Sequence, residues 1–132
     1  MLPFEARWEK AARGSSGFLY PWGKKWKEDR CNSYECGLRR TSPVGIFPDG
    51  KSPYGCLDMS GNVWEWCSDW YEDKYYKKSP DHNPEGPTNG SGRVLRGGSW
   101  FNLRRNCRAA SRDASHPAGR FDRCGFRLAR LL

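Results

Sequence analysis

Glycine and proline interrupt this sequence so often that no long regular element can form over most of its length. Fifteen Gly and nine Pro occur among 132 residues, and between Gly17 and Gly61 a Gly, Pro, Asn or Ser recurs every few positions. These residues mark turns and end regular elements. Seven Trp, six Tyr and six Phe argue against disorder, because disordered chains are poor in aromatics. We therefore expect one packed, loop-rich domain over residues 1–132 and exclude a helix bundle.

A few stretches have the pattern of regular elements. Residues 4–13 lack Gly and Pro, and their apolar side chains recur at i, i+4, i+7 and i+8, which predicts a helix. Residues 62–70 alternate apolar and polar side chains and predict a strand or an aromatic-rich loop. Residues 92–100 begin as a strand, and residues 125–132 predict a closing strand. Residues 71–92 are polar and rich in Pro and Gly, so we expect a long loop there.

The positive charge lies at the C-terminal end. The net charge is +8, yet residues 1–92 hold 13 basic and 13 acidic groups, whereas residues 93–132 hold ten Arg, no Lys and two Asp. Such arginines either bind loop carbonyls and carboxylates within the fold or form an anion-binding surface. The absence of Lys favours the structural interpretation and disfavours nucleic acid as a partner, although an Arg-rich nucleic-acid-binding domain stays an alternative.

The sequence carries no predicted export or membrane segment. Its N-terminus has no apolar signal region, and no apolar run approaches the roughly 18 residues that a membrane span needs. We expect a soluble chain without a membrane span. Its localisation stays unknown, and display on a surface through a separate anchor or partner stays open.

The six cysteines do not follow the spacing of a zinc site. No C-x-x-C pair occurs, and the two histidines, His82 and His116, lie far from any such pair and are interpreted as solvated loop residues. An even number of cysteines allows disulfides, and Cys31 and Cys36 are close enough to bridge a loop. The absence of a signal region argues against them, so both states stay open.

No catalytic motif follows from the residues alone. A nucleophile elbow, a phosphate-binding loop and a metalloprotease helix are all absent. The Gly97-Gly98-Ser99 segment is interpreted as a tight turn or bulge rather than as the site of a serine nucleophile. Asp58, Asn62, Glu65 and Asp69 offer oxygen ligands that could suit calcium, but without EF-hand spacing.

Short motifs spread over nearly the whole chain carry more information. In order they are Leu2-Pro3, Glu5-Ala6, Trp8-Glu9, Tyr20-Pro21-Trp22-Gly23, Thr41-Ser42-Pro43-Val44-Gly45, Tyr54-Gly55, Asp58-Met59-Ser60-Gly61-Asn62-Val63-Trp64-Glu65-Trp66, Arg93-Val94-Leu95-Arg96-Gly97-Gly98-Ser99-Trp100, Cys107-Arg108-Ala109-Ala110-Ser111-Arg112 and Gly125-Phe126-Arg127. In this order they resemble the formylglycine-generating-enzyme (sulfatase-modifying) family. The resemblance implies an α+β, C-type-lectin-type fold with short helices, small antiparallel sheets and much irregular loop.

The resemblance does not extend to the chemistry of the oxidase members. Their two active-site cysteines bind copper and convert a substrate cysteine into formylglycine. By the resemblance these cysteines fall at Arg104 and Ala109, and neither position is Cys. Cys107 is a single, shifted thiol and cannot form the pair. We therefore expect no enzyme and no required cofactor, and keep an oxidase relative as an alternative.

A family calcium site can be carried over by the same resemblance. It implies a side-chain oxygen at Asp58, the carbonyls of Gly61 and Val63, and the carboxylate of Glu65, so a structural calcium ion is a candidate. A second family site would fall at Asn32, Ser33, Cys36 and Leu38, where Cys36 replaces the carboxylate. The second site is therefore not predicted.

The C-terminal segment resembles the variable proteins of diversity-generating retroelements, a second branch of this superfamily. Those proteins display a ligand-binding surface copied with errors at adenines, so that a randomised AAC or AAT codon never yields Lys, Glu, Gln, Met or Trp. Residues 101–124 contain none of these five, whereas the other 108 residues contain 24. Residues 93–132 are thus a candidate variable region. Its candidate ligand-binding positions are Phe101, Asn102, Leu103, Arg105, Ser111, Asp113, Ser115, His116, Gly119, Phe121, Asp122 and Arg123.

A diversified surface needs a scaffold that does not vary. The fixed positions of the region would be Cys107, Arg108, Ala110, Arg112, Pro117 and Arg120. Loops on a rigid scaffold tolerate exchange of side chains, whereas a core does not. We predict selective, non-catalytic binding of a protein or other surface ligand, and the positive field favours an acidic one.

Overall fold

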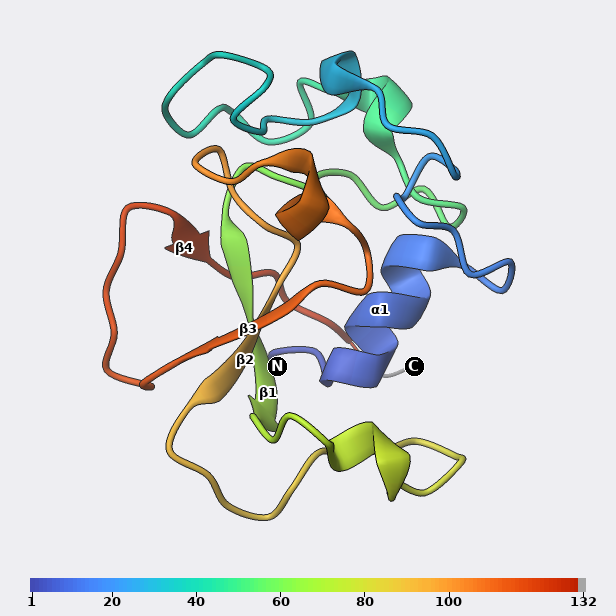
Figure 1. The fold of residues 1–132 in the computed structure, drawn as a ribbon, viewed down its shortest axis with the longest axis vertical. Helices are drawn as coiled ribbons and strands as arrows, with labels where there is room; N and C mark the ends of the chain where they lie inside the picture. Colours follow the sequence, from blue (N-terminus) through green and yellow to red (C-terminus); the bar gives the residue numbers. More distant parts are fainter. Residues whose placement is uncertain (131–132) are drawn as a thin grey trace.

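Four short strands form one sheet in the computed structural model, which describes residues 1–130 (Figure 1). They are β1 (Trp64–Trp70), β2 (Arg93–Arg96), β3 (Arg112–Ser115) and β4 (Cys124–Gly125). The spatial order is β3-β2-β1-β4, with antiparallel pairing except between β1 and β4, which run parallel. The predicted α+β class is confirmed, although the sheet is mixed rather than wholly antiparallel.

Helix α1 (Glu5–Arg13) is the one α-helix of the described residues, and it matches the predicted helix over 4–13. It ends at Gly14, whose φ of 65° suits glycine at a helix C-terminus. Trp8 and Ala12 are buried against the sheet with Met59, Cys67, Val94 and Ala109. The apolar face read from the sequence therefore supplies two of the six residues of this core cluster. No helix within residues 1–130 has the length and apolar character to cross a membrane.

Most of the chain outside these elements is irregular, as the density of Gly and Pro predicts. Over residues 1–130, four 3-10 turns interrupt the loops, at Glu28–Arg30, Pro48–Gly50, Tyr75–Lys77 and Arg104–Cys107. Gly97 lies at a bend directly after β2, where a tight turn or bulge was predicted, and the φ values of Gly97 and Gly98, 99° and 73°, lie in the left-handed region that favours glycine. A Cβ on Gly98 would stand 2.8 Å from the Cys107 sulfur and 2.9 Å from the Asn106 carbonyl oxygen.

The predicted closing strand over 125–132 is wrong for most of its length. Strand pairing ends at Gly125, residues 126–130 are not in a strand, and residues 131–132 lie outside the described part. Phe126 and Leu128 are 66% and 72% exposed, so their alternation does not mark a buried face. Arg127, between them, lies beyond the end of β4, and its guanidinium binds the Glu65 carboxylate and the Leu57 carbonyl.

The cysteines are all free thiols, so the structure does not contain the Cys31–Cys36 bridge left open by the sequence. Cys31 is buried and its thiol lies within hydrogen-bonding reach of Cys107. That hydrogen bond, together with burial, raises the pKa of the Cys31 thiol far above its ordinary value.

A buried charge network connects α1 to the sheet. Arg96 on β2 is fully buried, and its guanidinium binds Glu5 at 2.7 Å, Glu9 at 2.7 Å and the Ala109 carbonyl at 2.5 Å. Glu5, itself 1% exposed, also accepts Arg112 Nε at 2.6 Å and the Tyr76 hydroxyl at 3.1 Å. A buried charge is stable only when it is paired and hydrogen-bonded, as here.

We expect Glu5→Gln to lower the free energy of unfolding by about 3 kcal/mol or more, because it leaves the buried Arg96 and the half-buried Arg112 without a full countercharge. Urea unfolding followed by tryptophan fluorescence measures the change. Glu28→Gln, on an exposed 3-10 turn, is the matched control and should change stability little. Equal effects of both variants would contradict a stabilising role of the network.

Asp69 makes the stability of the fold depend on pH. Burial raises the pKa of this carboxyl to about 6, although it accepts the Glu5 main-chain N–H at 2.7 Å. The folded protein therefore binds a proton more tightly than the unfolded chain, and the resulting stability is lost as the pH rises from about 4 through 6. We expect Asp69→Asn to flatten this part of the stability–pH curve. Parallel wild-type and variant curves would show that Asp69 does not titrate in this range.

Candidate ligand-binding surface

The twelve predicted ligand-binding residues lie outside the core. They occupy the turn after β2, the β3 strand with its approach, and the loop from β3 to β4, coloured orange to red in Figure 1. Phe101, Leu103, Arg105, Asp113, His116, Phe121 and Asp122 are exposed, and Asn102, Ser111, Ser115, Gly119 and Arg123 are half-buried. Changes at these positions therefore alter a surface rather than the core.

Two contacts bring separate parts of this set together. The Arg123 guanidinium lies over the Phe101 ring, 5.1 Å from its centroid, and joins the end of the β3–β4 loop to the turn after β2. The Ser111 hydroxyl donates to the Arg105 carbonyl at 2.9 Å. The side chains of Asp113 and His116 accept hydrogen bonds only locally within residues 1–130, from Ala114 N and Ala118 N. The candidates thus form one patch around Phe101 and Arg123 and another around Arg105 and Ser111. The edge strand β3 lies beside them.

Asn102 differs from the other candidates because its side chain supports the fold. Its Oδ1 accepts Trp64 Nε1 at 2.9 Å and the Ser99 hydroxyl at 2.6 Å. Its carbonyl oxygen accepts the Tyr34 main-chain N–H at 2.9 Å. Replacing Asn102 would leave the buried Trp64 indole N–H without its acceptor, so this position is the least free of the twelve to vary.

Only some of the predicted fixed positions are buried. Cys107 is fully buried, and Arg112 extends inward to Glu5. Arg108, Ala110, Pro117 and Arg120 are exposed, so burial does not explain why they would be fixed.

Sequence reasoning missed the surface next to these residues. One cavity of about 570 Å³ brings together residues from both parts of the chain: Trp26, Glu28, Glu35, Leu103, Arg104 and Arg105. Trp26 packs edge-on against Tyr20 at 5.2 Å, and Tyr20 stacks on Trp22 at 5.3 Å. About seventy residues of sequence separate the two walls, so no local pattern could have placed them together.

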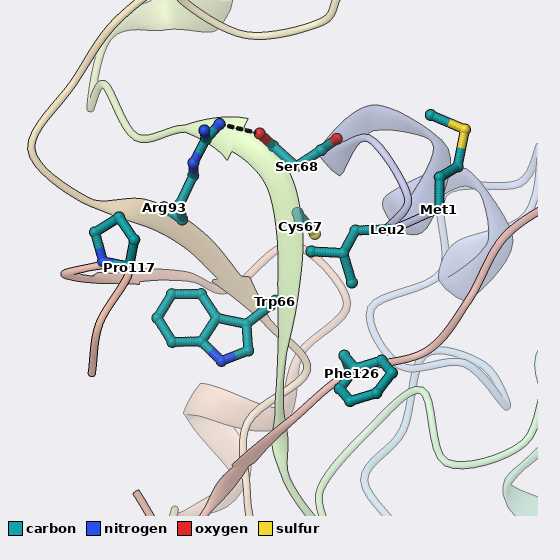
Figure 2. A pocket seen from close by; sticks show the side chains of 8 residues that line it. All are labelled: Met1, Leu2, Trp66, Cys67, Ser68, Arg93, Pro117 and Phe126. Carbon is teal, nitrogen blue, oxygen red and sulfur yellow. Dashed lines mark hydrogen bonds between the residues drawn. The ribbon is translucent and has the colours of Figure 1, made fainter. Parts of the chain in front are cut away.

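A mainly apolar groove beside Met1 and Leu2 offers no reactive side chain. It has a volume of about 530 Å³ and is lined by Met1, Leu2, Trp66, Cys67, Ser68, Arg93, Pro117 and Phe126 (Figure 2). The Arg93 guanidinium stacks on Trp70 at 3.6 Å and donates to the Ser68 carbonyl. Burial raises the pKa of the Cys67 thiol, which therefore stays protonated and unreactive.

Three of the four residues of the predicted calcium site, all except Gly61, lie around another cavity. Asp58, Val63 and Glu65 line a space of about 450 Å³ together with Arg127. Asp58 accepts the Gly45 N–H at 2.7 Å, and the two Glu65 oxygens bind Arg127 at 2.6 and 2.7 Å. Glu65 also accepts Trp8 Nε1 at 2.6 Å. Hard oxygen donors suit calcium, but a cation here would share Glu65 with a guanidinium.

No group of three or more His, Cys, Asp or Glu side chains that could hold a metal ion is found within residues 1–130. The predicted calcium site contains only two carboxylates and would depend on main-chain carbonyls. Calcium binding therefore stays a prediction, and Arg127 already neutralises the buried Glu65 charge.

Comparison with known proteins identifies the family. The model of the sulfatase-modifying factor enzyme 1-like domain matches residues 1–132. The chain belongs to this family. The formylglycine-generating enzyme of Streptomyces coelicolor is 40% identical over 149 residues, which cover 97% of this chain and 46% of that enzyme. The serine/threonine-protein kinase pkn1 of Chlamydia pneumoniae is 41% identical, over 99% of this chain and 21% of the kinase.

A solved structure gives the same result for the fold. Variable protein 1 of Treponema denticola superimposes with a TM-score of 0.85 and 35% identity, over 96% of this chain and 45% of that protein. The C-type-lectin-type fold expected from the motifs is thus shown. The chain spans less than half the length of each of these three relatives.

Calcium can be tested on the free protein. We expect the domain to stay folded in EDTA, since Arg127 neutralises Glu65, and expect calcium at saturation to raise the melting temperature. Asp58→Asn removes one ligand charge and keeps a residue that tolerates the φ of 55° found there, so it should reduce the calcium-induced rise. Magnesium is the control ion. Equal melting temperatures in calcium and EDTA would contradict the prediction.

Proposed function

We propose that this domain binds ligands selectively, without catalysis, through a surface formed by residues 101–123. The observation that carries the proposal is the separation of the two sets of side chains. All twelve candidates are exposed or half-buried, whereas Glu5, Arg96 and Cys107 behind them are buried. Such a division allows the surface to change while the fold persists. The likeness to a protein named variable protein 1 supports the same assignment.

The thiol within residues 101–123 is placed unfavourably for catalysis. Arg104 is exposed and Ala109 is buried at the two positions where the family resemblance places the oxidase cysteines. Cys107 is fully buried, so its sulfur does not reach the surface. A nucleophilic or metal-binding thiol requires access to its substrate, and none of residues 101–123 offers it.

The ligand class follows from the exposed side chains. Arg105 and Arg123 lie among the exposed Phe101, Leu103 and Phe121. Arginine and aromatic residues dominate protein-binding hot spots, and an exposed guanidinium such as that of Arg105 favours acidic groups, whereas Arg123 already contacts Asp122 at 3.6 Å. We therefore propose a protein or other surface ligand with acidic character.

The gene neighbourhood tests the proposal directly. A near-copy of the segment encoding residues 93–132, beside a reverse-transcriptase gene and differing only at adenines of the copy, is the expected finding. The differing codons would also identify the binding residues. A complete genome without such a copy would remove the retroelement assignment and leave a non-catalytic binding domain of unknown partner.

Tolerance to substitution can be measured on the protein. Leu103→Ser, Arg105→Ser and Phe121→Ser should each change the free energy of unfolding by less than about 0.5 kcal/mol, because these side chains are exposed. Arg112→Ser, which leaves Glu5 less well paired, should cost about 2 kcal/mol. Chemical unfolding measures all four. A loss above about 2 kcal/mol at the three surface positions would argue against a diversified face.

A further inference from the structure

The loop of residues 31–40 borders the candidate surface although it lies outside the candidate variable region. The Tyr34 main-chain N–H donates to the Asn102 carbonyl at 2.9 Å. The Arg104 N–H donates to Glu35 Oε1 at 2.8 Å. Asn32, buried at the base of the loop, donates to the Arg40 carbonyl at 2.8 Å. The loop is thus closed on itself and fastened to the turn that carries Phe101.

An arginine is stacked on an exposed aromatic ring at each side of this junction. The Arg39 guanidinium lies 3.6 Å from the Tyr34 ring centroid, and its Nη1 donates to the Tyr34 carbonyl. Arg123 lies over Phe101 in the same manner at 5.1 Å. Tyr34 and Phe101 are 43% and 55% exposed. A stacked guanidinium keeps donors at its edge that bind a carboxylate.

The charge of this area is positive and only partly compensated. Within residues 1–130, Arg39, Arg104 and Arg105 form no ion pair with a carboxylate. All three are exposed. Unpaired guanidiniums beside aromatic rings provide both the charge and the flat contact surface that anchor an acidic peptide segment.

We propose that Tyr34 and Arg39 form a fixed anchor that binds an acidic side chain of a polypeptide ligand next to the diversified residues. This inference rests on the proposed function and extends its site. A polypeptide fits better than nucleic acid because the exposed Glu28, in the cavity beside Arg104, and the exposed Asp122, beside Arg123, would repel a continuous phosphate backbone. Acidic side chains spaced along a peptide can avoid these carboxylates.

Binding of fluorescent poly-L-glutamate to the full chain at low salt tests the anchor. Arg39→Gln and Tyr34→Leu should each weaken binding about tenfold, the expected loss of one charge-assisted contact. Arg39→Lys keeps the charge but not the planar fork, so it should restore only part of the affinity. Arg7→Gln is the matched control, because Arg7 is also exposed and lies over an aromatic ring, Phe4, on α1. It should change the affinity less than twofold.

Each other result has a definite meaning. Equal effects of Arg39→Gln and Arg7→Gln would show general electrostatic attraction and overturn the anchor. Loss of affinity in Arg105→Gln but not in Arg39→Gln would overturn the anchor and leave the proposed function intact. Binding of duplex DNA in place of poly-L-glutamate would overturn the polypeptide assignment. Melting temperatures near the wild-type value establish that each variant is folded.

Discussion

The buried Arg96 guanidinium is the interaction on which the rest of the structure depends. A charge without water must be surrounded by acceptors, and Arg96 finds them in Glu5, Glu9 and the Ala109 carbonyl. These partners come from α1 and from the turn before β3, so one side chain fixes how the helix, the sheet and the C-terminal segment meet. The surface of residues 101–123 is built directly on this arrangement.

The ten arginines of residues 93–132 have different roles in the structure, and their common charge does not distinguish these roles. Arg96, Arg112 and Arg127 bind glutamates within the fold, as the structural interpretation of the sequence expected. Arg105 and Arg120 are exposed and point to the other interpretation, an anion-binding surface. Composition alone cannot divide the two groups, because burial depends on the partners that the fold supplies.

Local patterns predicted α1, β1 and the start of β2 because their apolar spacing matches the faces they bury. The same reasoning failed after Gly125. There the ion pair between Arg127 and the buried Glu65 carboxylate, rather than the alternation of apolar side chains, determines the path of the chain. For the candidate ligand-binding surface, the sequence indicated which segment of the chain forms it but not which side chains contact one another. That Asn102 supports Trp64 and that Tyr34 borders the surface both depend on contacts between residues more than thirty positions apart, which no sequence window contains.

Helix α1 lies near the start of the chain, yet its charged partners lie near the end. Glu5 binds Arg112, and the Met1 carbonyl accepts the Ala129 N–H at 2.9 Å. The chain between these partners must close into a long loop before the contacts can stabilise the fold. The entropy cost of that closure slows folding. During synthesis Trp8 therefore stays without its core neighbours until β1 and β2 have left the ribosome, and Glu5 lacks its second guanidinium until Arg112 of β3 has followed. A chaperone that shields this apolar stripe on the nascent chain would raise the yield of folded protein.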